Sequence, residues 1–77
     1  ASCRSRAAAA ARDLQEALRL EPRHWAALES LSRLQEEAGD VEGALRSHRA
    51  ALTLHPRLPD GEERLRELTT KAEGQAL

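Results

Sequence analysis

Two prolines in this chain, Pro22 and Pro56, each close the same Ala-Leu-x-Leu-x-Pro-Arg motif. When residues 10–23 are laid on residues 44–57, seven of the fourteen positions carry the same residue. This offset matches the period of about 34 residues that is typical of helix-turn-helix arrays, in which each unit buries its apolar face only against a neighbour. The repeated motif therefore predicts a stack of antiparallel helices.

The apolar residues of this 77-residue chain are almost all Ala and Leu, which favours helices over strands. Twelve basic and thirteen acidic side chains nearly balance, so bulk charge favours neither nucleic acid nor a membrane surface as a partner. The sequence has no apolar run long enough for a membrane span, and its single cysteine, Cys3, has no partner for an internal disulfide. We expect a small all-α, cytoplasmic domain that is a fragment or a processed product, since Met is absent.

Apolar spacing predicts one domain over residues 1–77, with helices at 5–20, 24–38, 41–54 and 60–73 and frayed tails at 1–4 and 74–77. Gly39 is expected to end the second helix in a left-handed conformation, and Asp40 to cap the third. The connection between these two helices is only about two residues long, which forces them to run antiparallel. Asp60 and Glu63 are expected to form a capping box at the start of the fourth helix.

Small residues recur where the first and third helices should meet their neighbours, at Ala10, Ala17, Ala44 and Ala51. The second and fourth helices carry Leu or Trp on the facing side. Alanine allows two helix axes to approach closely, whereas a larger side chain would hold them apart. We therefore expect these alanines to be buried between helices.

Taken together, these residues resemble one complete unit of the tetratricopeptide repeat family. The matching positions are Leu28, Leu31, Gly39, Asp40, Ala44, Ala51, Leu52, Leu54 and Pro56. Residues 10–22 resemble the second helix of a preceding repeat, and the segment from residue 60 to about 73 resembles the first helix of a following repeat or a terminal solvating helix. The sequence departs from the family at Leu28, Ser32, Gln35 and His48, in place of Trp, Gly, Tyr and an aromatic residue. We expect these departures to weaken the packing and to leave the turns intact.

The resemblance implies a concave face, built by the first helix of each pair, that binds an extended peptide or a partner helix. Its expected lining is Ala26, Glu29, Ser30, Arg33, Glu36, Glu37, Asp60, Glu63, Arg64, Glu67 and Lys71, in which six acids face three bases. Co-chaperones of this family hold acidic C-terminal tails with Lys, Arg and Asn, because a carboxylate needs charge-assisted donors. We therefore expect a basic or amphipathic protein partner; the alternative is that these charges are only a solvated surface.

No constellation of catalytic or metal-binding residues is present in the sequence. His24, His48 and His55 lack the i, i+4 spacing that presents two metal ligands on one helix face. We expect no catalytic residue, no metal and no cofactor, with a buried and hydrogen-bonded His48 and with the other two histidines solvated at helix ends. Trp25, the only aromatic residue, is expected to pack over the turn against the first helix; the alternative is a binding anchor.

The function that follows is a non-catalytic protein interaction scaffold or adaptor. Two alternatives remain: a substrate-recruiting or dimerising arm of a larger enzyme such as a hydroxylase or ligase, by analogy alone, and a plain four-helix bundle that dimerises through its first helix. Changing Glu29, Glu36 and Glu63 to Lys is expected to weaken binding of a basic partner without unfolding the chain.

One full repeat between two half-repeats is fewer than the three or so usually needed for independent stability. We therefore predict that the isolated 77-residue chain is either marginally stable or self-associates through its Ala-rich first helix. Thermal unfolding followed by circular dichroism, together with the solution mass, tests this. A monomer with a high, cooperative melting midpoint would contradict it.

Overall fold

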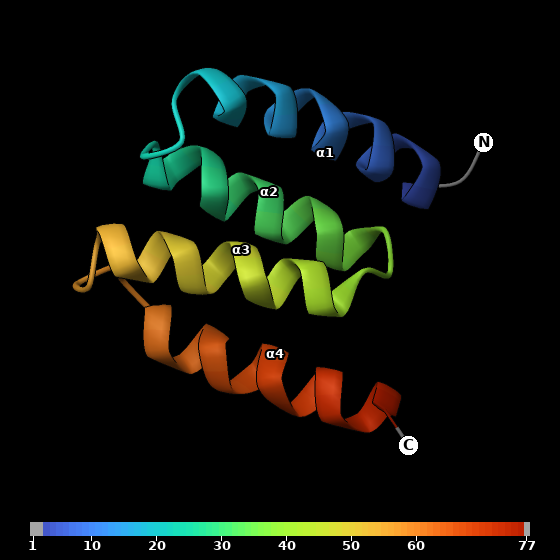
Figure 1. Ribbon diagram of the computed structural model, residues 1–77. Coiled ribbons are helices and arrows are strands. Elements are labelled where there is room, and N and C mark those ends of the chain that lie inside the picture. Colours follow the sequence, from blue (N-terminus) through green and yellow to red (C-terminus); the bar gives the residue numbers. More distant parts are fainter. Residues whose placement is uncertain (1–2, 77) are drawn as a thin grey trace.

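The computed structural model describes residues 3–76, which form four α-helices and no strand. The helices are α1 (Cys3–Leu20), α2 (Trp25–Glu37), α3 (Val41–Leu54) and α4 (Gly61–Ala76). They run alternately up and down, and each packs beside the next in chain order (Figure 1). The expected all-α helical array is therefore confirmed.

The helix bounds differ from those expected mainly at the two ends of the chain. α1 already includes Cys3, and α4 continues to Ala76, so residues 3–4 and 74–76 are helical where fraying was expected. Neither end segment contains a proline, and Arg4, Gln75 and Ala76 favour a helix, so α4 continues past Gly74 in spite of the low helix propensity of glycine. Residues 1, 2 and 77, also expected to fray, lie outside the described residues.

The two proline motifs form the same kind of turn. In the first, the His24 amide donates to the Glu21 carbonyl (3.3 Å), and in the second the Leu58 amide donates to the His55 carbonyl (3.1 Å). Each bond spans a Pro-Arg pair, because the fixed φ of proline suits the second position of such a turn and proline cannot continue a helix. The repeat in the sequence is thus also a repeat of backbone structure.

The repeat is interrupted between α3 and α4. A further turn, closed by a hydrogen bond from the Gly61 amide to the Leu58 carbonyl (3.0 Å), precedes α4. If the spacing of the two prolines also separated the starts of α2 and α4, α4 would begin earlier than it does, because α2 begins at Trp25 and α4 only at Gly61. Asp60 in this turn has a φ of 58°. In the described part of the chain, neither Asp60 nor Glu63 makes the expected capping hydrogen bonds. A capping side chain normally acts from an extended backbone, which the left-handed φ of Asp60 does not provide.

The turn between α2 and α3 forms as expected. Gly39 has a φ of 90°, and the Asp40 amide donates to the Gln35 carbonyl (2.8 Å), which satisfies a carbonyl at the end of α2. The Asp40 carboxylate accepts a hydrogen bond from the Gly43 amide (3.0 Å) and so caps α3. A Cβ on Gly43 would collide with this carboxylate, so the missing side chain makes room for the cap.

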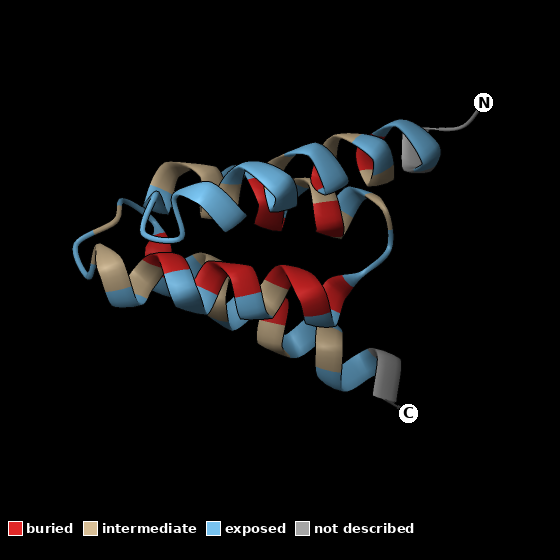
Figure 2. Ribbon diagram, turned by 45° about the horizontal axis from the view of Figure 1, so that its top comes forward, coloured by how far each residue is buried: buried red, intermediate tan, exposed pale blue. Residues whose placement is uncertain are grey.

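Buried residues line the contacts between successive helices (Figure 2). Ala44 and Ala51 are fully buried, as their small size predicts, and Val41 packs with Leu68 where α3 meets α4. The expectation for Ala17 was wrong, because this residue is exposed. Within the described structure α1 packs against α2 alone, so only one of its faces is covered.

We predict that Ala51→Leu destabilises the fold by about 1–3 kcal/mol, because a fully buried alanine leaves no room for a larger side chain. Ala50→Leu is the matched control, since Ala50 is the exposed neighbour on the same helix and should change stability by about 0.5 kcal/mol or less. Urea unfolding of both variants measures the difference. Equal changes in the unfolding free energy of the two variants would show that the helix interface can accommodate a larger side chain at position 51.

Candidate functional site

The name α2/α4 face is used below for the eleven residues expected to bind a partner, which lie on α2, on α4 and, for Asp60, in the turn before α4. Glu36 of α2 joins the two helices, because its carboxylate accepts a hydrogen bond from Nη1 of Arg64 (3.0 Å) and pairs with Nζ of Lys71. Nη2 of Arg64 also donates to the Ser32 hydroxyl (3.1 Å). These contacts fix α4 relative to α2 across one side of α3.

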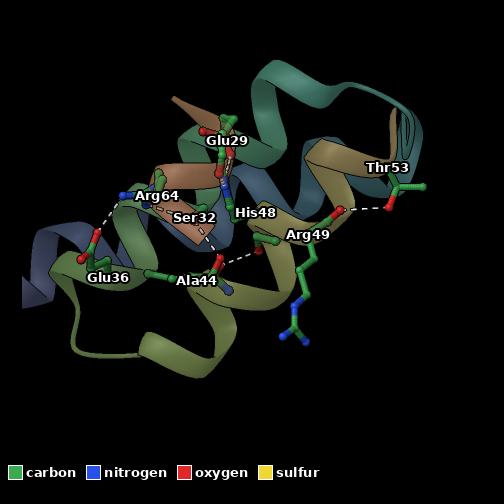
Figure 3. Close-up of polar contacts among 11 residues, drawn as sticks. Glu29, Ser32, Glu36, Ala44, His48, Arg49, Thr53 and Arg64 are labelled. Atoms are coloured by element: carbon green, nitrogen blue, oxygen red, sulfur yellow. Dashed lines mark hydrogen bonds and ion pairs between the residues drawn. The ribbon is translucent and has the colours of Figure 1, made fainter. Parts of the chain in front are cut away.

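His48 of α3 is fully buried behind this face, with both ring nitrogens engaged (Figure 3). Nε2 lies 2.7 Å from the Gly61 carbonyl oxygen at the start of α4, and Nδ1 pairs with Oε1 of Glu29 on α2. A carbonyl only accepts hydrogen bonds, so Nε2 carries a hydrogen and donates it. The expectation of a buried, hydrogen-bonded histidine is confirmed, and its bonds connect three helices.

Ser32 and Gln35, two of the departures from the family pattern, are also buried and hydrogen-bonded. The Ser32 hydroxyl donates to the Ala44 carbonyl (2.7 Å), and the Ser47 hydroxyl donates to Oε1 of Gln35 (2.6 Å). Both bonds link α2 to α3, and Ser47 is buried as well. Buried polar groups are tolerated when they are paired, so these positions hold the helices together by hydrogen bonds in place of apolar contact.

The ion pairs at Glu36 change its acidity. The hydrogen bond from Lys71 lowers the pKa of the Glu36 carboxyl below its ordinary value of 4.5, partial burial opposes this, and Arg64 adds to the lowering. Arg64 is mostly buried, and its Nε is the one buried side-chain nitrogen or oxygen without a partner among the described residues. Glu36 is therefore a structural carboxylate at the centre of the α2/α4 face.

The remaining charges of this face point to solvent. Ala26 is half-buried, Ser30 and Arg33 are exposed, and four acids are exposed without an ion-pair partner in the described structure: Glu37, Asp60, Glu63 and Glu67. A shallow hollow on α4 is lined by Asp60, Glu63, Arg64 and Glu67. Among these eleven residues, internal pairing thus leaves four acids and one base, Arg33. Arg66 of α4 is also exposed and lines a hollow together with Glu63, Glu67 and Lys71.

Two of the three carboxylates chosen from the sequence for charge reversal are part of the internal network. Glu29 pairs with His48, and Glu36 pairs with Arg64 and Lys71. A lysine at either position would place a cation against existing cations or beside a buried imidazole. These partners, which the sequence alone does not reveal, argue against the expectation that replacing Glu29 and Glu36 leaves the fold intact.

Trp25 and the two histidines at helix ends make contacts within the fold; His24 is exposed as expected, whereas His55, expected to be solvated, is half-buried. Trp25 is 39% exposed, and its ring packs edge-to-face on that of His55 at the end of α3, with ring centroids 4.5 Å apart. The expected packing of Trp25 against the first helix stays a prediction. His24 caps α2, because its Nδ1 accepts a hydrogen bond from the Ala27 amide (3.0 Å). Leu20, at the end of α1, is 83% exposed. The contact between Trp25 and His55 therefore links the turn that follows α1 to the turn that follows α3.

No group of three or more His, Cys, Asp or Glu among the described residues is placed to hold a metal ion. In the same part of the chain, none of the helices combines the length and the apolar character needed to cross a membrane. Neither a protein-family model, nor a curated protein, nor a solved structure matches this chain.

The lowered pKa of Glu36 predicts a stability that depends on pH. A carboxyl with a lowered folded-state pKa stabilises the fold above its unfolded value, near 4.5, and this contribution is lost as the pH falls through the folded value. We expect Glu36→Gln to lower the free energy of unfolding by about 1 kcal/mol at neutral pH. In acid, the unfolding free energies of the variant and the unmodified chain should become more similar. Urea unfolding across acidic and neutral pH measures this difference.

Glu37→Gln is the control for this measurement, because Glu37 is the exposed neighbour without an ion-pair partner in the described structure. It should leave the unfolding free energy within about 0.5 kcal/mol at every pH. A Glu36 variant that behaved in the same way would show that its pairs with α4 contribute nothing to stability.

Proposed function

We propose that this chain is a non-catalytic protein interaction scaffold or adaptor whose α2/α4 face binds a basic or amphipathic peptide or partner helix. The observation that carries the proposal is the pairing of Glu36 with both Arg64 and Lys71. These are the two bases of α4 on this face, and their pairing leaves the unpaired charge of the face mostly acidic.

The backbone arrangement supports the resemblance to a tetratricopeptide repeat. Equivalent turns recur at the two proline motifs, α2 and α4 both pack on α3, and their side chains meet on one side of it. Hydrogen bonds that Arg64 donates to Glu36 and Ser32 hold that side in place before any partner arrives. A surface fixed in advance loses less conformational freedom on binding, which favours affinity.

Charge supports the choice of partner. Glu37, Glu63 and Glu67 are exposed, and carboxylates accept charge-assisted hydrogen bonds from Lys and Arg. An excess of acids also attracts a basic segment during diffusional encounter and repels an acidic one. An acidic C-terminal tail would find two exposed bases without an ion-pair partner in the described structure, Arg33 and the neighbouring Arg66, against four unpaired acids.

We predict that Glu37→Lys, Glu63→Lys and Glu67→Lys together weaken binding of an amphipathic Lys- and Leu-rich peptide by roughly 3- to 150-fold, since each of the three lost pairs contributes about 0.2–1 kcal/mol. Fluorescence anisotropy of the labelled peptide measures the affinity. The variants avoid both internally paired carboxylates, Glu29 and Glu36, so the fold should be retained, which circular dichroism checks.

A matched control carries the same change of net charge on other surfaces. Asp13→Lys, Glu16→Lys and Glu42→Lys replace three exposed acids of α1 and α3 and should reduce binding much less. Equal losses in both triple variants would show attraction by bulk charge alone. Preferential capture of an acidic peptide by the unmodified chain would overturn the proposal.

A further inference from the structure

α1 lies at the edge of the stack and packs against α2 alone, whereas α3 lies between α2 and α4 (Figure 1). Pro22 and Pro56 lie 34 residues apart, and this offset pairs each residue of α1 with one residue of α3. A residue of α1 that corresponds to a residue of α3 in contact with α2 therefore marks a surface that lacks its covering helix.

The solvent side of α3 has the same character in α1. Arg46 and Arg49 are exposed on α3, and the residues of α1 that correspond to them, Arg12 and Gln15, are exposed and polar as well. The internal repeat thus preserves the side of the helix that needs no partner, which makes the two helices comparable position by position.

The side of α3 toward α2 is buried. The Ala44 carbonyl accepts a hydrogen bond from the Ser32 hydroxyl, and the Ser47 hydroxyl donates one to Gln35, so both residues of α3 lie against α2. Ala51 follows at helical spacing on the same side and is fully buried.

The corresponding surface of α1, called the outer face of α1 below, is formed by Ala10, Asp13, Ala17 and Leu20. Asp13 and Ala17 are exposed, and Leu20 is 83% exposed, whereas its counterpart on α3, Leu54, is half-buried. Apart from one carboxylate, this face has the apolar sequence of a covered surface without the cover. Its position in the repeat also explains why Ala17 is small and yet exposed.

We propose that the outer face of α1 docks an amphipathic helix of a partner protein that resembles α2, with Lys or Arg opposite Asp13 and an apolar side chain opposite Leu14. Ser47 holds the position of Asp13 in α3 and bonds to Gln35, so the residue at the Gln35 position of the docked helix faces Asp13. A carboxylate that a helix covers needs a donor, and a base supplies a charge-assisted hydrogen bond.

The apolar requirement follows from the second difference between the two helices. His48 pairs with Glu29 of α2, but the corresponding residue of α1 is Leu14, which offers no hydrogen bond. A carboxylate at the Glu29 position of the docked helix would be buried without a partner, which costs free energy. The small Ala10 and Ala17 leave room for close approach, as alanines do between packed helices.

Asp13 argues against a second copy of this chain as the occupant. It lies midway between Ala10 and Ala17, so two α1 helices packed on each other about a two-fold axis would bring their Asp13 carboxylates together. Burying two like charges without a partner is costly. The outer face therefore fits a helix of different sequence better than itself.

The other charges of α1 restrict the partner further. Arg6, Arg12 and Arg19 are exposed, against the two acids Asp13 and Glu16. A helix that is basic all round would meet these three arginines, whereas a helix with a single base opposite Asp13 would not. The outer face of α1 and the acidic α2/α4 face therefore select helices of different charge.

The probe for this face is a labelled peptide with the sequence of residues 24–38, which span α2, and the changes Gln35→Arg and Glu29→Ala. The change Arg33→Lys allows a lactam to Glu37, which holds the peptide helical because both positions are exposed on α2 and lie one turn apart. Fluorescence anisotropy should show saturable binding of this peptide to the full chain. A lack of saturable binding would overturn the proposal.

A charge swap tests the contact with Asp13. Asp13→Lys should weaken binding of the probe by roughly tenfold or more, and a second probe with Gln35→Glu should bind the Asp13→Lys chain more tightly than the unmodified chain. Glu16→Lys is the matched control, because Glu16 corresponds to the exposed Ala50 and should change both affinities much less. Equal effects of the two lysine variants would exclude the contact.

Ala17→Gln tests the close approach of the helices. Ala17 is exposed in the chain alone, so this change should leave the urea midpoint where it is and still weaken probe binding, whereas Ala50→Gln on the solvent side of α3 should do neither. Probe binding unaffected by Ala17→Gln would contradict the proposal. A dimer of the unmodified chain that Ala17→Gln dissociates would show a second copy on this face and would overturn it as well.

Discussion

The fully buried imidazole of His48 is the contact on which the arrangement of α2, α3 and α4 depends. It sits on the central helix and bonds to a side chain of α2 and to the first residue of α4. Apolar packing alone would allow α4 to slide or rotate on α3, because contacts between Ala and Leu have little directional preference. Hydrogen bonds with fixed donors and acceptors select one position among those that burial would permit.

These polar contacts are possible because the helices approach closely. The fully buried Ala44 and Ala51 allow α3 to come near its neighbours, and the Ser32 hydroxyl then reaches the Ala44 carbonyl across the interface. A larger residue at position 44 would move that carbonyl away from the hydroxyl. Small residues and buried polar residues are therefore parts of one packing solution, and neither would work without the other.

The turns that follow α1, α2 and α3 were predictable from sequence because their signals are local, whereas the outer ends of α1 and α4 and the start of α4 were not. A proline cannot continue the interior of a helix, and Gly39 followed by Asp40 both ends one helix and caps the next. The polar core was not predictable from apolar periodicity, which treats Ser32 and Gln35 as interruptions of the buried stripe. Their spacing on one helix face was the available signal, but their partners lie far along the chain, on α3.

The same limitation applies to the candidate binding face. Sequence placed Glu29, Glu36 and Glu63 on one surface as equivalent acids, and only the three-dimensional partners distinguish them. A carboxylate that is bound internally is not available to a partner without loss of the contact it already makes, whereas an exposed one loses only water. The charge that this face offers to a partner therefore depends on internal contacts. The ion pairs that hold α4 in place also occupy Arg64 and Lys71 of α4, so these two bases are not free to bind a partner.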